Sequence, residues 1–182
     1  LFLKTYLDKD FKPVKNFRAK TLLGKWIISR TQELGKEVRK WMDQYEITKA
    51  ARLFNDFVDD LSNWYIRRSR RYFQKPKDKK EKEEASQTLY LVLKDLSKIS
   101  APFLPFLSEQ VYQELKSKGE RESVHLCDFP KPNNRLIVKS LEEKMKTVRE
   151  IVALALAKRA EAKIKVRQPL SSLQLTTRNL QT

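Results

Sequence analysis

Apolar residues recur three or four positions apart over most of this chain, which is the spacing that gives a helix one buried face. Only three glycines occur among the 182 residues, so the sequence has few of the tight turns that an all-β fold needs. We therefore predict an all-α fold, an antiparallel helical bundle of four to five helices. The predicted helices cover residues 20–41, a stretch from Thr48 (its N-cap) into the arginines at 67–71, then 89–99, 102–115 and 136–163. Their apolar stripes place eight side chains in the core: Trp26, Phe54, Phe57, Leu61, Trp64, Leu93, Phe103 and Phe106.

Three segments interrupt the helical pattern. Residues 76–84, PKDKKEKEE, are charged throughout and predict a solvated connection. Residues 123–134, SVHLCDFPKPNN, alternate in polarity and end in prolines, which predicts a short extended segment that crosses the surface. Residues 164–175, IKVRQPLSSLQL, predict a C-terminal strand-like tail that begins another domain.

The chain carries a formal net charge of +16 at pH 7. An excess of this size favours a polyanionic partner, because neutralising phosphates releases counterions. The longest apolar run, at residues 151–157, is far shorter than the roughly 20 residues of a membrane-spanning helix, so we expect no membrane partner. The single cysteine, Cys127, excludes an internal disulfide and a cysteine-cluster zinc site, and it favours a reducing, cytoplasmic location.

The stretch NWYIRRSRRYF, residues 63–73, places four arginines directly after a Trp-Tyr pair. At about 100° per residue, Arg68 falls within the apolar stripe of its helix, whereas Arg67, Arg70 and Arg71 fall on the polar face. None of these three has a carboxylate three or four positions before it, so each is available to an outside partner such as RNA phosphate. The alternative is that they only stabilise the helix C-terminus, by about 0.3–1 kcal/mol each.

Tyr72 and Phe73 follow the arginines, where their rings either stack on RNA bases or seal the end of the bundle.

A catalytic site is not indicated. The only histidine, His125, has no second catalytic group in its segment and is interpreted as structural. Asp59 and Asp60 are adjacent, so on a helix they point about 100° apart and cannot form a carboxylate pair. We assign no catalytic and no metal-binding residue.

Four further basic residues are candidate RNA contacts near the C-terminus. Arg159 and Lys163 continue the apolar seam of the last predicted helix, so they must leave the bundle and meet solvent, RNA or another domain. Lys165 and Arg167 alternate in the strand-like tail and share one side of it. They either contact phosphate or pair with the domain that follows.

Four blocks of the sequence carry a family resemblance. They are FVDDLSNWYIRRSRRYF at 57–73, TLYLVLKDLSKISAPFLPFLSEQVYQEL at 88–115, SVHLCDFP at 123–130 and IKVRQPLSSL at 164–173. In this order and spacing they resemble the part of isoleucyl-tRNA synthetases that follows the catalytic domain. The combination of RRSRR with KVRQPL points to the isoleucine enzyme. One departure is Gln74, where that family often carries Trp.

The resemblance implies a segment leaving a catalytic domain at 1–19, a helical anticodon-binding domain at 20–163 and the start of a junction domain at 164–182. It implies two partners, tRNA-Ile and the catalytic domain of the same parent chain, in a monomeric protein. Neither an HIGH-like nor a KMSKS-like ATP signature occurs in these residues. We therefore expect this chain to be catalytically inert and to hold no cofactor, while ATP and magnesium serve the parent enzyme.

Two alternatives remain at the level of sequence. One is a basic helical module that docks on acidic protein. The other is the same domain of another class I synthetase for an aliphatic amino acid, the valyl enzyme. The salt dependence of tRNA binding separates RNA binding from protein docking, because phosphate contacts give a steep slope.

Overall fold

The computed structural model describes residues 11–174. Its helices, in chain order, are α2 (Leu22–Asp43), α3 (Ile47–Asp59), a π-helical segment (Asp60–Ile66), α4 (Arg67–Gln74), α5 (Lys79–Ser100), α6 (Pro105–Leu115) and α7 (Lys139–Glu161). Two short 3₁₀ turns, Val124–Leu126 and Asn134–Leu136, lie between α6 and α7. No strand occurs in residues 11–174, so the prediction of an all-α fold is confirmed.

Side-chain caps and a proline explain where several helices begin. The Thr21 hydroxyl accepts a hydrogen bond from the Gly24 amide at 3.2 Å, and the Asp78 carboxylate accepts one from the Glu81 amide at 2.8 Å. Pro105 occupies the first turn of α6, where its missing amide hydrogen costs nothing.

Three of the predicted connections and boundaries are wrong in detail. Residues 76–84 are not simply a solvated connection, because the Asp78 cap starts α5 at Lys79. The N-cap position of α3 is Glu46, without a side-chain cap, rather than Thr48. The described part of the strand-like tail, residues 164–174, contains turns and no strand, and residue 175 lies outside the described part.

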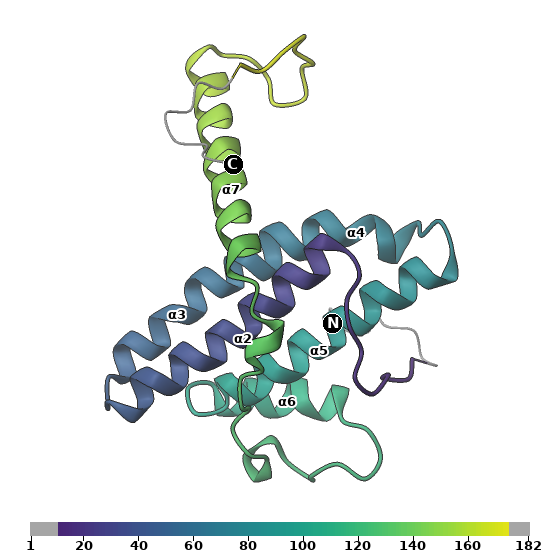
Figure 1. The fold of residues 1–182 in the computed structure, drawn as a ribbon, viewed down its shortest axis with the longest axis vertical. Coiled ribbons are helices and arrows are strands. Elements are labelled where there is room, and N and C mark those ends of the chain that lie inside the picture. The colour runs from purple at the N-terminus through teal and green to yellow at the C-terminus, as the bar shows by residue number, and fades with distance from the viewer. Residues whose placement is uncertain (1–10, 175–182) are drawn as a thin grey trace. The chain divides into compact units, whose positions relative to one another are not determined.

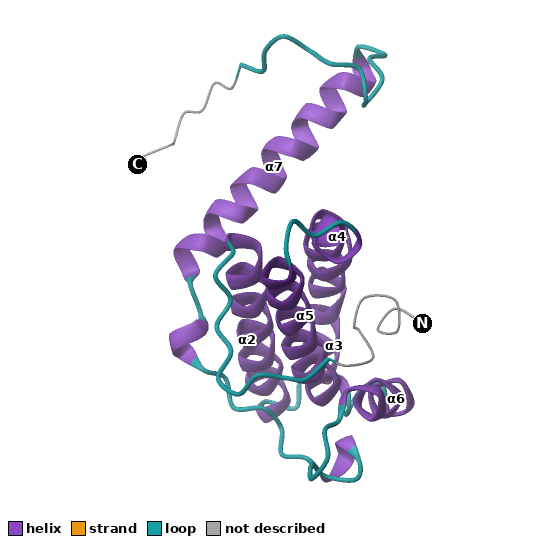
Figure 2. Ribbon diagram, turned by 90° about the vertical axis from the view of Figure 1, so that its right-hand side faces the viewer, coloured by secondary structure: helices purple, strands orange, loops and turns teal. Residues whose placement is uncertain are grey.

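The chain divides into two compact units, Leu1–Glu142 and Glu143–Thr182. Of the predicted segment 1–19, residues 1–10 lie outside the described part. In the first unit, α2 and α3 run in opposite directions, joined by a short turn, and α5 lies beside them (Figure 1). Figure 2 shows α6 at one edge of this group, where it packs against α5.

The core of the first unit lies where α2, α3 and α5 meet. The predicted core residues Trp26, Phe57 and Leu61 are 1%, 0% and 5% exposed. The predicted residues that are only half-buried are Phe54, Trp64, Leu93 and Phe103. The rings of Phe54 and Phe103 meet edge to face with centroids 5.2 Å apart.

Phe106 is 90% exposed, so its prediction as a core residue is wrong. The buried positions of α6 are Ser108, Tyr112 and Leu115. Phe106 precedes Ser108 by two residues, which places it about 200° away on the helix, on the face turned to solvent. Apolar spacing alone did not distinguish which side of α6 the rest of the protein covers.

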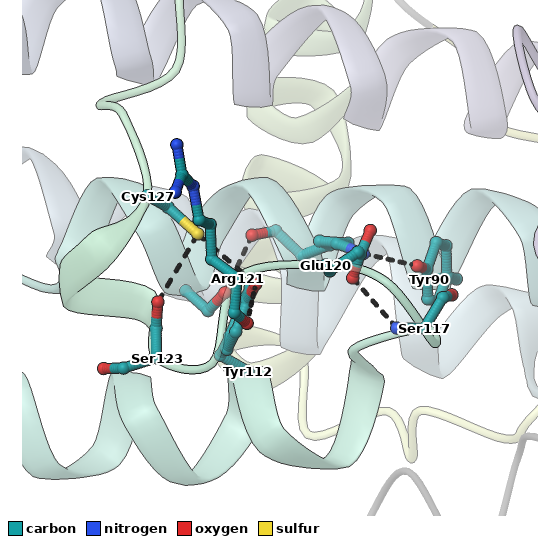
Figure 3. A network of polar contacts seen from close by, with 9 residues as sticks. Tyr90, Tyr112, Ser117, Glu120, Arg121, Ser123 and Cys127 are labelled. Carbon is teal, nitrogen blue, oxygen red and sulfur yellow. Dashed lines mark hydrogen bonds and ion pairs between the residues drawn. The ribbon is translucent and has the colours of Figure 1, made fainter.

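The crossing segment between α6 and α7 is held by side chains of the helices beneath it. Tyr112 donates a hydrogen bond to the Arg121 carbonyl at 3.0 Å, and Glu109 accepts from the Val124 amide at 2.9 Å. The Lys94 ammonium, 8% exposed as a residue, pairs with Glu120 and donates to the Tyr90 hydroxyl at 2.7 Å (Figure 3). The segment contains 3₁₀ turns rather than a continuous extended stretch.

Candidate nucleic-acid interface

The π-helical segment determines which side of α4 faces the core. A π-helix places more residues in each turn than an α-helix, so it shifts the residues after it around the helix axis. Ser69 is 1% exposed and Phe73 is 7% exposed, whereas Arg68 is exposed. The buried line runs at every fourth residue: Phe57, Leu61, Tyr65, Ser69 and Phe73. The prediction that Arg68 continues the buried stripe is therefore wrong, because regular α-helical spacing was assumed through residues 60–66.

A partly buried ion pair anchors the π-helical segment to α2. The Arg30 guanidinium lies 2.9 Å from the carboxylate of Asp60, the first residue of the segment, which is 1% exposed. Burial acts to lower the pKa of Arg30, but the carboxylates of Asp60 and Glu142 outweigh it and raise that pKa. Arg30 therefore stays charged, and Asp60 is not available as a site for other ligands.

The arginines of α4 all lie on its solvent side. Arg67, Arg68 and Arg70 are exposed, and within residues 11–174 none of their side chains makes a hydrogen bond or an ion pair. Arg71 differs, because it lies 3.5 Å from Glu81 of α5 and its guanidinium carbon lies 4.6 Å from the Tyr72 ring centroid. The absence of a carboxylate within the helix did not leave Arg71 unpaired, since its partner comes from the next helix.

The two aromatic candidates have different environments. Phe73 is 7% exposed and packs inside the first unit, which corresponds to the sealing alternative. Tyr72 is half-buried, with its ring against Arg71 and beside a small cavity that Thr21 and Glu84 also line. Only Tyr72 of the two presents part of its ring at the surface.

Basic side chains beyond the arginine cluster occupy the same end of the first unit. Lys75 and Lys77 lie in the turn between α4 and α5, and Lys79 and Lys80 begin α5; all four are exposed. Sequence reasoning missed them because their charges alternate with glutamates. The high density of lysine in residues 75–82 was the signal that pointed to them.

The candidates near the C-terminus, in the second unit, divide differently. The Arg159 guanidinium donates to the carbonyls of Lys165 at 3.0 Å and Gln168 at 2.9 Å, so it holds the turn that follows α7. Lys163 has a φ of 54° and ends the helix in the left-handed region. Lys163, Lys165 and Arg167 are exposed.

Other kinds of site find no support in residues 11–174. No group of histidine, cysteine, aspartate or glutamate side chains there is arranged to hold a metal ion. His125 is exposed and sits in the 3₁₀ turn Val124–Leu126. No helix in this part of the chain combines the length and the apolar character that crossing a membrane requires.

A helical unit with an exposed arginine-rich helix has the kind of surface that nucleic-acid-binding domains present to phosphate. Residues 24–174 match the family of anticodon-binding domains of tRNA ligases, and the chain belongs to this family.

Similar proteins include three isoleucine–tRNA ligases. The chain is 45% identical over 177 residues to the one from Chlamydia trachomatis serovar L2, which is 96% of this chain and 17% of that protein. It is 46% identical over 185 residues to the one from Clostridium acetobutylicum, covering 98% of this chain and 18% of that protein. It is 46% identical over 169 residues to the one from Protochlamydia amoebophila, covering 92% of this chain and 16% of that protein. The chain thus spans about a sixth of the length of these relatives.

Proposed function

We propose that this chain is the tRNA-binding domain of an isoleucine–tRNA ligase and that it binds tRNA-Ile through phosphate contacts. The observation that carries the proposal is the set of exposed arginines on α4, of which Arg67, Arg68 and Arg70 have no side-chain partner within residues 11–174. Exposed guanidinium groups without a partner are suited to phosphate, because they bind it in bidentate geometry. The names of the relatives supply the identity of the tRNA.

In this proposal the RNA contacts fall into two groups. Arg67, Arg70 and Arg71 make phosphate contacts, and the Tyr72 ring is a stacking surface beside them. Lys163, Lys165 and Arg167 provide charge at the second unit, while Arg159 acts by holding the turn that presents them. Phe73 supports α4 from inside the first unit and makes no contact with RNA.

The rest of the ligase supplies the chemistry. A catalytic domain of the same parent chain uses ATP and magnesium to activate isoleucine, and the parent is a cytoplasmic monomer. This chain by itself is expected to show no isoleucine-dependent pyrophosphate exchange, since it contains neither ATP signature.

The test is the affinity of the chain for tRNA-Ile over a series of salt concentrations. Affinity falls as salt rises, so the slope of log affinity against log salt is negative. Arg67→Ala and Arg70→Ala each reduce the magnitude of this slope by about one, because each removes a phosphate contact. Arg52→Ala is the matched control, an exposed arginine of α3 without a partner in residues 11–174, and it leaves the slope unchanged. Equal slopes for the wild type and both α4 variants contradict the proposal, and a flat salt dependence favours a protein-docking module. Equal affinity for tRNA-Val contradicts the assignment to isoleucine.

A further inference from the structure

A cavity with a volume of about 520 Å³ lies between the N-terminal segment and the beginning of α5. This volume falls within the range of roughly 300–1,000 Å³ that is typical of small-ligand pockets. Lys12, Lys79 and Lys82 line it against one carboxylate, Glu83. The cavity therefore favours an anionic ligand.

Side-chain contacts hold the walls of this cavity in place. The Gln87 side chain donates to the Lys12 carbonyl at 2.7 Å and accepts from the Val14 amide at 3.0 Å. The Phe11 ring packs against Tyr90 with centroids 5.4 Å apart. The N-terminal segment is thus fastened to α5 on both sides of Lys12, and the cavity exists before any ligand binds.

The lining combines groups that suit a phosphate with groups that suit a base. Lysine ammonium groups pair with phosphate oxygens. Phe11 is half-buried and offers a ring on which any base can stack. The Ser86 hydroxyl, in a residue 4% exposed, makes no hydrogen bond within residues 11–174 and is left to bond a polar ligand atom.

Helix α4 contacts the same turn of α5 that contributes to the cavity. Arg71 lies 3.5 Å from Glu81, which belongs to the same turn of α5 as Lys79 and Lys82. The α4 arginines and the cavity are thus joined through the first turn of α5.

We infer that this cavity holds one unstacked nucleotide of the bound RNA, with its phosphate at Lys79 and its base against Phe11. The inference rests on the proposed function and adds to it a pocket that reads a single nucleotide, where the α4 arginines only grip the backbone.

One experiment detects the base. Anticodon stem–loop RNAs carry 2-aminopurine at each loop position in turn, and the fluorescence of each is measured on binding to this chain. One position is strongly quenched by the wild type, because stacking on a ring quenches this base. Phe11→Leu keeps an apolar side chain against Tyr90 but removes the ring, and it abolishes that quenching while the salt slope is unchanged.

A second experiment detects the phosphate with a matched pair of variants. Lys79 and Lys80 are adjacent and exposed at the start of α5, but only Lys79 lines the cavity. Lys79→Gln lowers the magnitude of the salt slope by about one. Lys80→Gln leaves it at the wild-type value.

The outcomes separate this inference from the proposed function. Suppose that Arg67→Ala reduces the magnitude of the salt slope. If Phe11→Leu then leaves every quenching signal intact, or if Lys79→Gln and Lys80→Gln have the same salt slope, the pocket assignment is wrong and the tRNA-binding function stands. If the wild-type chain shows no salt-dependent binding of the stem–loops, both are wrong.

Discussion

Tyr45 ends helix α2 in the left-handed region, with a φ of 59°. The Tyr45 amide donates to the Met42 carbonyl at 3.0 Å, and the Glu46 amide donates to the Trp41 carbonyl at 2.9 Å, so the turn closes the helix with two hydrogen bonds. Residues with a side chain are strained in this conformation, and glycine is not.

Replacement of Tyr45 by glycine is expected to stabilise the protein. Because the side chain is 90% exposed, its loss removes little packing, and relief of the backbone strain raises the free energy of unfolding by about 0.5–1 kcal/mol. Tyr45→Ala is the control, since it removes the same ring but keeps the Cβ atom and therefore gains nothing. Urea unfolding followed by circular dichroism measures both variants. Equal stability of the two shows that the backbone is not strained at this residue.

At the scale of the element, the π-helical segment decides the orientation of α4. Ser69, rather than Arg68, faces the core, so the two adjacent residues differ sharply in their tolerance of charge.

Ser69→Lys is expected to lower the free energy of unfolding by at least about 2 kcal/mol, because it buries an unpaired ammonium group. Arg68→Ala is expected to change it by less than about 0.5 kcal/mol. Thermal or urea unfolding of the two variants is the measurement. A larger loss for Arg68→Ala than for Ser69→Lys means that the α-helix continues without the π-helical shift.

The crossing segment provides a prediction for pH at the same scale. Glu120 accepts hydrogen bonds from Lys94 and, at 2.9 Å, from the Ser117 amide. Burial acts to raise the pKa of Glu120, but Lys94 and the Ser117 amide together hold that pKa below its ordinary value. A lowered carboxylate pKa contributes stability above the pKa of the unfolded state, about 4.3, and this contribution is lost as the pH falls through the folded-state pKa.

Glu120→Gln should therefore remove part of the acid sensitivity of the protein. The wild type loses more stability than the variant between pH 7 and about pH 3. At pH 7 the free energies of unfolding of the wild type and Glu120→Gln differ by less than about 1 kcal/mol, because 34% of the Glu120 side chain is exposed to solvent. Urea unfolding at both pH values is the measurement, with Glu122→Gln, an exposed carboxylate nearby, as control. An identical pH dependence of the wild type and Glu120→Gln refutes the assignment.

On the scale of the whole molecule, the first compact unit extends only to Glu142, and the start of α7 belongs to it. The Ser29 hydroxyl accepts from the Val138 amide at 2.8 Å and donates to Glu142. Lys139 pairs with Glu33 at 2.6 Å, and Glu33 is 9% exposed. These contacts tie the first residues of α7 to α2.

Two truncated chains test this division. A chain that ends after residue 150 keeps every contact of the first unit and is expected to unfold at the same urea concentration as the transition of that unit in the full chain. A chain that ends after residue 136 leaves the buried Ser29 and Glu33 without their partners, and its free energy of unfolding is expected to fall by about 2–4 kcal/mol. If the shorter chain is as stable as the longer one, the contacts of Val138, Lys139 and Glu142 contribute nothing to the unit.

The sequence by itself determined the all-α class, the approximate positions of the helices and the family. Three- and four-residue spacing of apolar residues is a local signal, so it indicates helices before any tertiary contact is known. The exposure of Arg67 and Arg70 was also predictable, because residues 63–73 are strongly polar on one face. The blocks that carry the family resemblance needed no structure at all.

The tertiary structure alone decided which faces are covered and which cations have partners. Phe106 lies on an exposed face and Arg68 was displaced by the π-helical segment, because burial depends on which neighbouring helix covers a side chain and not on the periodicity of one helix. Arg71 and Arg159 found partners at Glu81 and at two carbonyl groups that lie beyond the ends of their own helices. The cavity at Lys12 and Lys79 joins positions that are far apart in sequence, so only folding brings its aromatic ring and its charges together.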